Sequence, residues 1–289
     1  MQVSFPPSIP ENDTDAERAA RTATVVCLSK LPPFHAAALK LLNLSSEATS
    51  AMNDFESVFR GDPALTADLL LVANSALFGN RAKIASIRHA LTHLGLDRVR
   101  SLASTISLSF FVRNQPRTAF VRHIWAHSVA TAVIAEALGD LYDVRDLYTA
   151  GLVHDLGRLG LVLTVGSNYE KWITPEFATI AEANQMEQAR FGMTHCEAGS
   201  LVGHKWGFPV VLRTCMLGHH GHENAVPPND PLLLVQLACR LADSLGFPEI
   251  HYQEEAVAPE LPQKVRTAAA MQPDRLRQSI ATQIDVIGR

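Results

Sequence analysis

The sequence has few cysteines, few aromatic residues and no long apolar run. Four of its 289 residues are cysteines and 7% are aromatic, and no two cysteines show the C-x-x-C spacing of a redox or zinc motif. This usage favours a reducing cytoplasm in which the thiols stay free. Residues 1–20 lack a basic segment followed by an apolar one, so no secretory signal is expected. The apolar stretch Leu159–Val165 is too short to span a bilayer, and we therefore expect a cytoplasmic protein.

An excess of positive charge is also absent. The formal net charge is -4 at pH 7, which gives the chain no general electrostatic attraction to nucleic acid or to an anionic membrane. A helix-turn-helix interpretation of ADLLLVANSALFG (residues 67–79) is disfavoured because no basic recognition helix accompanies it. We therefore expect neither a nucleic-acid partner nor a membrane partner.

Strand signals are scarce, whereas helix-start signals are frequent. Asp62-Pro63 and Asp230-Pro231 have the pattern of an N-cap followed by a proline in the first helical position. Thr194 is followed three residues later by a glutamate, which is a capping box, and Thr174-Pro175 predicts a helix that runs toward Gly192. With 47% hydrophobic residues for the core, the sequence predicts an all-α fold, a multi-helix bundle.

The second half of the chain carries a series of potential metal ligands. Imidazole and carboxylate groups are suited to divalent iron, manganese, zinc or nickel. Four of these ligands form two adjacent pairs, and adjacent helical residues project about 100° apart, so a pair can reach two neighbouring ions. The sequence therefore indicates a site for two metal ions. The candidate ligands are His127, His154, Asp155, His195, His219, His220 and Asp243.

Each of these residues taken singly has a plainer interpretation. His154 or His195 could be a histidine at a helix end or at the edge of the core. The pair His219-His220 could interact with the dipole at a helix C-terminus, and Asp243 could be a buried capping or ion-pairing group. Their occurrence together favours metal binding over these alternatives.

The order of these motifs resembles the HD superfamily of metal-dependent phosphohydrolases, and in particular its HDOD branch, the HD-related output domain of bacterial signalling proteins. Three stretches carry the resemblance and together span about residues 30–247. The first comprises LPPFHAAALKLL, FRGDPALTADLLLVANSALFG and IASIRHALTHLGLDRVRSL. The second comprises WAHSVATAVIAEAL and AGLVHDLGRLGL. The third runs from QARFGMTHCEAGSLVGHKWGFPVVLRTCMLGHHGHE to RLADSLG.

The resemblance implies a site with two divalent ions, which could be iron, manganese, zinc, nickel or magnesium. One ion would be held by His127, His154, Asp155 and Asp243. The other would be held by His195, His219 and His220, with Asp155 bridging. Asp155 would be catalytic, and Arg158 would contact the phosphate in the place where relatives carry lysine. Of the remaining histidines, His123 and His222 could protonate a leaving group.

Two functions follow from the resemblance. The first is hydrolysis of a phosphomonoester or phosphodiester, with a signalling nucleotide as one candidate substrate. The second is a non-catalytic regulatory module that binds a protein partner and keeps a structural or vestigial metal site. The intact ligand set favours the enzyme. The absence of the GYP extension in HHGHENAVPPNDP argues against cyclic-di-GMP as the substrate.

The expected organisation has four parts. Residues 1–20 are expected to form a loose leader, and residues 21–115 the N-terminal HDOD helical subdomain. Residues 116–250 would form the HD-type metal-binding subdomain, and residues 251–289 a helical tail interrupted at Pro273. The boundary near residue 115 rests on the polar, proline-containing stretch RNQPRT between two long helices.

Overall fold

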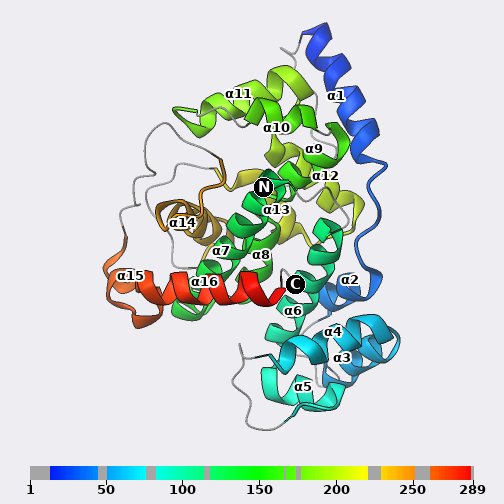
Figure 1. Cartoon of the computed structure of the whole chain (residues 1–289), viewed down its shortest axis with the longest axis vertical. Helices are drawn as coiled ribbons and strands as arrows, with labels where there is room; N and C mark the ends of the chain where they lie inside the picture. Colours follow the sequence, from blue (N-terminus) through cyan, green and yellow to red (C-terminus); the bar gives the residue numbers. More distant parts are fainter. Residues whose placement is uncertain are drawn as a thin grey trace.

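The all-α expectation is confirmed by the structure, a computed structural model that describes residues 14–44, 51–75, 83–113, 118–165, 167–173, 177–220, 229–250 and 261–287. Within these ranges the chain forms helices and no strand (Figure 1). None of the described helices is long and apolar enough to cross a bilayer. The boundary expected near residue 115 falls on residues 114–117, outside the described ranges.

Five helices pack around the first of two hydrophobic clusters, at the lower end of the molecule in Figure 1. Phe55, Phe59 and Leu69 are fully buried in this cluster. The predicted start at Asp62-Pro63 is confirmed, because the Asp62 carboxylate accepts the Leu65 amide at 2.9 Å. The helices are α2 (Ala36–Asn43), α3 (Ala51–Arg60), α4 (Pro63–Ala73), α5 (Ile87–Leu94) and α6 (Leu96–Arg113).

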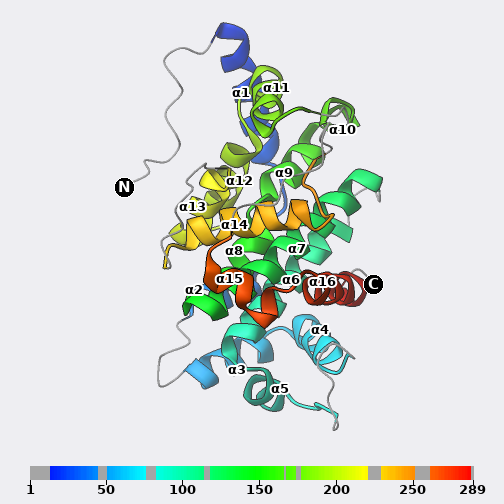
Figure 2. The ribbon, with the colours of Figure 1, turned by 90° about the vertical axis from the view of Figure 1, so that its left-hand side faces the viewer.

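A second set of helices surrounds the long helix α7 (Ala119–Tyr142), which is buried along most of its length. Helices α8 and α14 pack directly against α7, and α12 packs against both α9 and α13 (Figure 2). This second hydrophobic cluster is the larger of the two. The other helices are α8 (Leu147–Val153), α9 (Leu156–Val165), α10 (Ser167–Ile173), α11 (Ile180–Phe191), α12 (His195–Lys205), α13 (Val210–Gly218) and α14 (Pro231–Ser244).

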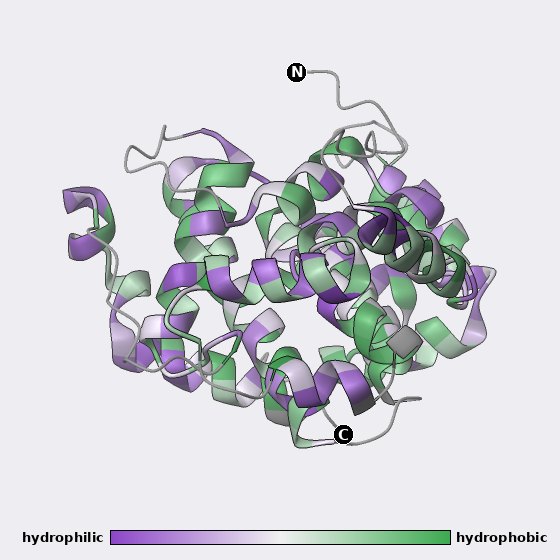
Figure 3. Cartoon of the chain, turned by 90° about the horizontal axis from the view of Figure 1, so that it is seen from above, coloured by the Kyte–Doolittle hydropathy of each residue, from purple (hydrophilic) through white to green (hydrophobic). Residues whose placement is uncertain are grey.

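The C-terminal segment folds back onto α7. It consists of α15 (Gln263–Thr267), a 3-10 turn (Ala269–Met271) and α16 (Pro273–Ile287). Pro273 starts α16, as its missing N–H and fixed φ favour. Ile280 is buried in the larger cluster, and the Tyr148 hydroxyl donates to Gln283 at 2.9 Å. The helices alternate hydrophilic and hydrophobic residues along their length (Figure 3), as expected of helices that bury one face.

The N-terminal boundary differs from expectation, because residues 15–20 belong to helix α1 (Asp15–Leu28) and not to a loose leader. A capping box formed by Thr14 and Glu17 starts this helix. The buried Arg21 donates to the Gly192 carbonyl at 2.9 Å and pairs with Glu197 at 3.0 Å. Gly192 has φ +66°, and a Cβ there would lie 2.3 Å from the Glu17 carbonyl oxygen. Helix α1 therefore packs on α11 and α12 in the second half of the chain.

One further helix start differs from the prediction, and another agrees with it. The helix expected to open at Thr174-Pro175 begins at Ile180, because Thr179 is its N-cap and accepts the Glu182 amide. Residues 174–176 lie outside the described ranges. The capping box at Thr194 is confirmed, and it starts α12 at His195. This second start fixes a candidate ligand in the first turn of a helix.

Candidate metal centre

His127 and His154 form the first part of the candidate site. His127 lies in α7, and His154 follows the last residue of α8. Their Nε2 atoms are 3.1 Å apart. The Nδ1 of His127 is 2.7 Å from the Phe247 carbonyl oxygen, and that of His154 is 2.6 Å from the Gly151 carbonyl oxygen. Both rings are fully buried, so the fold holds their Nε2 atoms toward each other.

His195, His219 and His220 form the second part. The Nε2 of His195 is 3.3 Å from that of His219 and 2.8 Å from that of His220. The Nδ1 of His219 lies 2.8 Å from the Met216 carbonyl oxygen, and the Nδ1 of His195 lies 2.7 Å from Glu187 Oε2. Helix α12 supplies His195, and the end of α13 supplies the pair.

The contacts at Nδ1 fix the tautomers of four rings. A carbonyl oxygen can only accept, so His127, His154 and His219 must carry their ring proton on Nδ1, which leaves a lone pair on Nε2. Glu187 has the same effect on His195 when its carboxylate is ionised. Burial lowers the pKa of all four imidazoles, which keeps them neutral. The Nε2 lone pairs therefore converge with no proton between them, an arrangement that a cation would stabilise.

The nitrogen spacings fit first-row divalent ions. Two imidazole nitrogens bound to one ion at about 2.0–2.1 Å lie about 2.8–3.4 Å apart for angles between octahedral and tetrahedral values. The contacts between Nε2 atoms of 3.1, 3.3 and 2.8 Å match this range. The donor atoms of His127 and His154, and separately those of His195, His219 and His220, lie within 4.8 Å of one another.

Asp155 lies in the short connection between α8 and α9 and is fully buried. Its Oδ1 is 3.7 Å from His195 Nε2, and its Oδ2 is 3.0 Å from Arg158 Nε. Neither oxygen has a hydrogen bond among the described residues. Burial raises the pKa of this carboxyl well above its ordinary value, and the charge of Arg158 opposes the rise. A buried carboxylate without hydrogen bonds is the second feature that fits a bound cation.

Arg158 is fully buried and is surrounded by carboxylates. Besides Asp155, its guanidinium lies 3.0 Å from Glu187 and 3.5 Å from Glu249, and it donates to the Tyr169 hydroxyl at 3.1 Å. We expected this arginine to contact a phosphate. The structure instead places Arg158 in a buried ion-pair network, where it contacts Asp155 and Glu187 and holds them in position.

Glu249 is the most strongly ionised acid of this network. Burial disfavours its charge, but the charge of Arg158 opposes burial and lowers the pKa of Glu249 below its ordinary value. Its Oε2 lies 3.3 Å from His220 Nε2. Glu187, by contrast, has its pKa raised by burial, against the effect of Arg158. Glu187 contacts His195 at Nδ1 and Glu249 contacts His220 at Nε2, so the two acids reach different histidines of the second group.

Asp243 stands apart from both groups of donor atoms. Its Oδ1 is 3.5 Å from His127 Nδ1, on the opposite edge of the ring from Nε2, and it accepts the Glu249 amide at 3.0 Å. In this arrangement Asp243 supports His127, and the sulfur of Cys239 lies 3.6 Å from His127 Nε2. Helix α14 carries Cys239 and Asp243, which lie one turn apart.

Four residues of the centre were not predicted from the sequence as part of it. Cys196 adjoins a predicted ligand and Cys239 precedes Asp243 by one helical turn, so proximity was an available signal. Glu187 and Glu249 had no such signal, because each reaches the site only through tertiary packing. Of the two histidines expected to donate a proton, His123 is half-buried on α7 outside both groups, and His222 lies outside the described residues.

Gly157 permits the close approach of α9 to α12. A Cβ at this position would lie 1.8 Å from the His195 carbonyl oxygen and 2.6 Å from the Gly199 nitrogen. Gly157 lies in the first turn of α9. Its role is steric, since only glycine lets Asp155 and His195 approach each other from adjacent helices.

A family model for the HDOD domain matches residues 31–222, about two thirds of the chain. The chain belongs to the HDOD family. Solved structures share this helical fold over nearly the whole chain. A signal transduction protein of provisional name from Marinobacter aquaeolei VT8 is 18% identical, with a TM-score of 0.72 over 98% of this chain and 68% of that one.

Two further relatives have similar folds. An HDOD domain protein from Geobacter sulfurreducens is 22% identical, with a TM-score of 0.65 over 94% of this chain and 97% of that one. A protein from Shewanella amazonensis SB2B, provisionally named a metal-dependent phosphohydrolase, is 18% identical, with a TM-score of 0.59 over 92% and 100% of the two chains. At these identities the likeness concerns the fold alone.

A curated relative from Treponema pallidum (strain Nichols), an uncharacterized protein, is 23% identical over 214 residues. The match covers 71% of this chain but 40% of the relative, so the chain spans about two fifths of the length of that protein.

Proposed function

We propose that this HDOD protein is a metal-dependent phosphohydrolase with two divalent ions. The observation that carries the proposal is the convergence of unprotonated Nε2 atoms in two groups, the second of which lies beside the buried Asp155 carboxylate. His127 and His154 would hold one ion and His195, His219 and His220 the other, with Asp155 between them. Bound divalent ions would polarise a phosphoryl oxygen and lower the pKa of a water that attacks phosphorus.

The surrounding residues would keep these ligands in position. Glu187 would orient His195 through the contact at Nδ1, and the carbonyls of Gly151 and Met216 would do the same for His154 and His219. Arg158 would hold Asp155 rather than bind the phosphate, since its guanidinium is buried among carboxylates. The substrate class is a phosphomonoester or phosphodiester, with a signalling nucleotide among the candidates.

The test combines metal analysis with an activity panel. Protein purified without a nickel column is analysed for bound metals and then assayed with manganese, iron, zinc or magnesium on generic and nucleotide phosphoesters. Hydrolysis should fall about 100-fold or more in Asp155→Asn, because the carboxylate between the ions is lost. The matched control is Asp274→Asn, whose carboxylate is fully exposed on α16. Equal turnover by Asp155→Asn would contradict the proposal.

A regulatory module is the second candidate, favoured by the enclosure of the site. His127, His154, Asp155, His195 and His219 have at most 2% of their surface exposed. Structural metal sites are closed in this way, whereas catalytic ones keep a position open to substrate. Metal bound at full stoichiometry with no turnover on any phosphoester, together with a lower melting temperature after metal removal, would favour the module.

A further inference from the structure

We infer that Cys196 and Cys239 are sulfur ligands, one in each histidine group, and that they make the centre select zinc or another thiophilic ion over magnesium or manganese. The inference rests on the proposed metal site and concerns its donor set. The four cysteines of the chain are free thiols, so both sulfurs are available for coordination.

Cys239 completes the first group. Helix α14 directs it toward α7, and its Sγ lies 3.6 Å from His127 Nε2. The side chain is buried with 2% of its surface exposed. The ligand atoms of His127, His154 and Cys239 all lie within 4.8 Å of one another.

Cys196 completes the second group from the first turn of α12. Its Sγ lies 3.5 Å from His195 Nε2 and 4.0 Å from His219 Nε2. With His220, these residues offer four ligand atoms within 4.8 Å of one another. These donors are one sulfur and three nitrogens, a set that suits zinc.

The sulfur distances fit coordination to a shared ion. A sulfur at about 2.3 Å and a nitrogen at about 2.0–2.1 Å from one ion lie about 3.1–3.6 Å apart for octahedral to tetrahedral angles. The 3.6 Å between Cys239 and His127 Nε2 and the 3.5 Å between Cys196 and His195 Nε2 lie at the tetrahedral end of this range, whereas the 4.0 Å from Cys196 to His219 Nε2 exceeds it. Asp155 Oδ1, which is buried without a hydrogen bond and lies 3.7 Å from His195 Nε2, points independently to a cation at the second group.

Coordination would convert each thiol to a thiolate. The S–H proton leaves to solvent as the bond from sulfur to metal forms, so one proton is released for each cysteine bound. Thiolate ligands favour zinc and other soft or borderline ions, whereas magnesium and manganese prefer oxygen. The two sulfurs thus predict which ion the centre holds.

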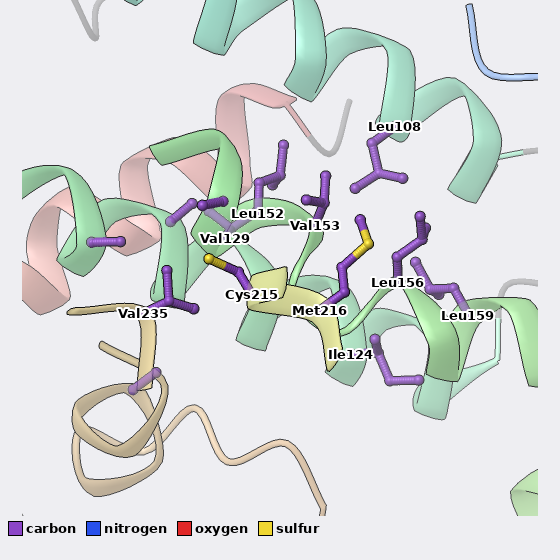
Figure 4. Close-up of a cluster of buried hydrophobic side chains, with 14 of the residues drawn as sticks. Leu108, Ile124, Val129, Leu152, Val153, Leu156, Leu159, Cys215, Met216 and Val235 are labelled. Atoms are coloured by element: carbon purple, nitrogen blue, oxygen red, sulfur yellow. The ribbon is translucent and has the colours of Figure 1, made fainter. Parts of the chain in front are cut away.

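Cys215 provides a matched control. It is buried, like the two candidate ligands, but lies in the hydrophobic cluster that also contains Val129, Leu152 and Val235 (Figure 4). A serine at Cys215 should change the core without changing the metal site.

The experiment loads the metal-free full chain with cobalt(II) and records its absorption. We expect a near-ultraviolet charge-transfer band from thiolate to cobalt, reduced by about half in Cys196→Ser and in Cys239→Ser and unchanged in Cys215→Ser. Competition between zinc and manganese on the same proteins should show that the native chain binds zinc more tightly. The ratio of the two affinities should fall at least about tenfold in Cys196→Ser or Cys239→Ser, because one metal–thiolate bond is lost.

The outcomes separate this inference from the proposed function. If bound cobalt shows its visible d–d bands but no charge-transfer band, sulfur ligation is overturned and the proposed nitrogen ligands remain. Failure of any divalent ion to bind would overturn both. If a serine variant fails to fold, X-ray absorption of the native zinc protein decides the question, because sulfur at about 2.3 Å is distinct from nitrogen at about 2.0 Å.

Discussion

His195 Nδ1 lies 2.7 Å from Glu187 Oε2, and both side chains are buried away from solvent. The same carboxylate oxygen accepts the His195 amide at 2.7 Å, so Glu187 fixes both the ring and the backbone at the start of α12. The Tyr169 hydroxyl and Arg158 bind its other oxygen at 2.7 and 3.0 Å. Glu187 is therefore a positioning residue for a predicted ligand.

Glu187→Gln should weaken metal binding about 10- to 100-fold, the usual cost of losing a carboxylate that orients a ligating histidine. The neutral amide of glutamine attracts the Nδ1–H of His195 less strongly than the glutamate carboxylate does. Titration with zinc, read by calorimetry, measures the change. Glu182→Gln, on the exposed side of the same helix, is the control and should bind zinc like the native chain. Unchanged affinity in Glu187→Gln would show that this contact does not tune the site.

Arg158→Ala should destabilise the metal-free protein by about 3–5 kcal/mol, because it leaves buried carboxylates without their cation. Urea denaturation measures the free energy of unfolding. Arg275→Ala removes an exposed arginine on α16 and should change it by less than about 0.5 kcal/mol. A similarly small change in Arg158→Ala would mean that the network is not needed for stability.

Gly157→Ala should cost about 3 kcal/mol or more, since the added Cβ would overlap the His195 carbonyl and force α9 and α12 apart. Thermal unfolding measures this cost, and zinc affinity should fall with it because His195 moves. Gly61→Ala is the comparison, since its nearest neighbour would be 3.4 Å away. Equal melting temperatures for the two variants would contradict the predicted overlap.

Glu136→Gln should stabilise the protein at pH 7. Burial raises the pKa of Glu136 above its ordinary value of 4.5, although Arg98 opposes the rise and Asp140 adds to it. Tyr148, from α8, also faces this carboxyl. The folded state holds the proton to higher pH than the unfolded state, so stability is lost as pH rises through the folded pKa. Glutamine has no proton to lose.

Melting temperatures at several pH values test this sign. The glutamine variant should exceed the native chain at pH 7, and the difference should shrink as the pH falls below 4.5, where both states of the native chain are protonated. A lower melting temperature for the variant at pH 7 would show that the contact between Arg98 and Glu136, 3.6 Å long, outweighs the cost of burial.

Local signals predicted much of the helical framework. The caps at Asp62, Thr194 and Asp230 were predicted because each acts through an amide two or three residues away. The start of α11 was predicted several residues before its actual position at Ile180. Thr174-Pro175 and Thr179 offer similar start signals, and only packing selects between them. Arg21 likewise draws α1 to Gly192 and Glu197 across more than 170 residues of sequence, which no local pattern indicates.

The sequence by itself determined the helical class, the order of the histidine and aspartate motifs and the family to which they belong, because these depend on residue type and short spacing. Tertiary structure alone decided which side chains meet. It brought Glu187, Glu249 and the two cysteines to the histidines, placed Asp243 beside the far edge of His127, and enclosed Arg158 among carboxylates. Such contacts depend on the packing of α7, α9, α12 and α14, and packing is a property of the whole chain.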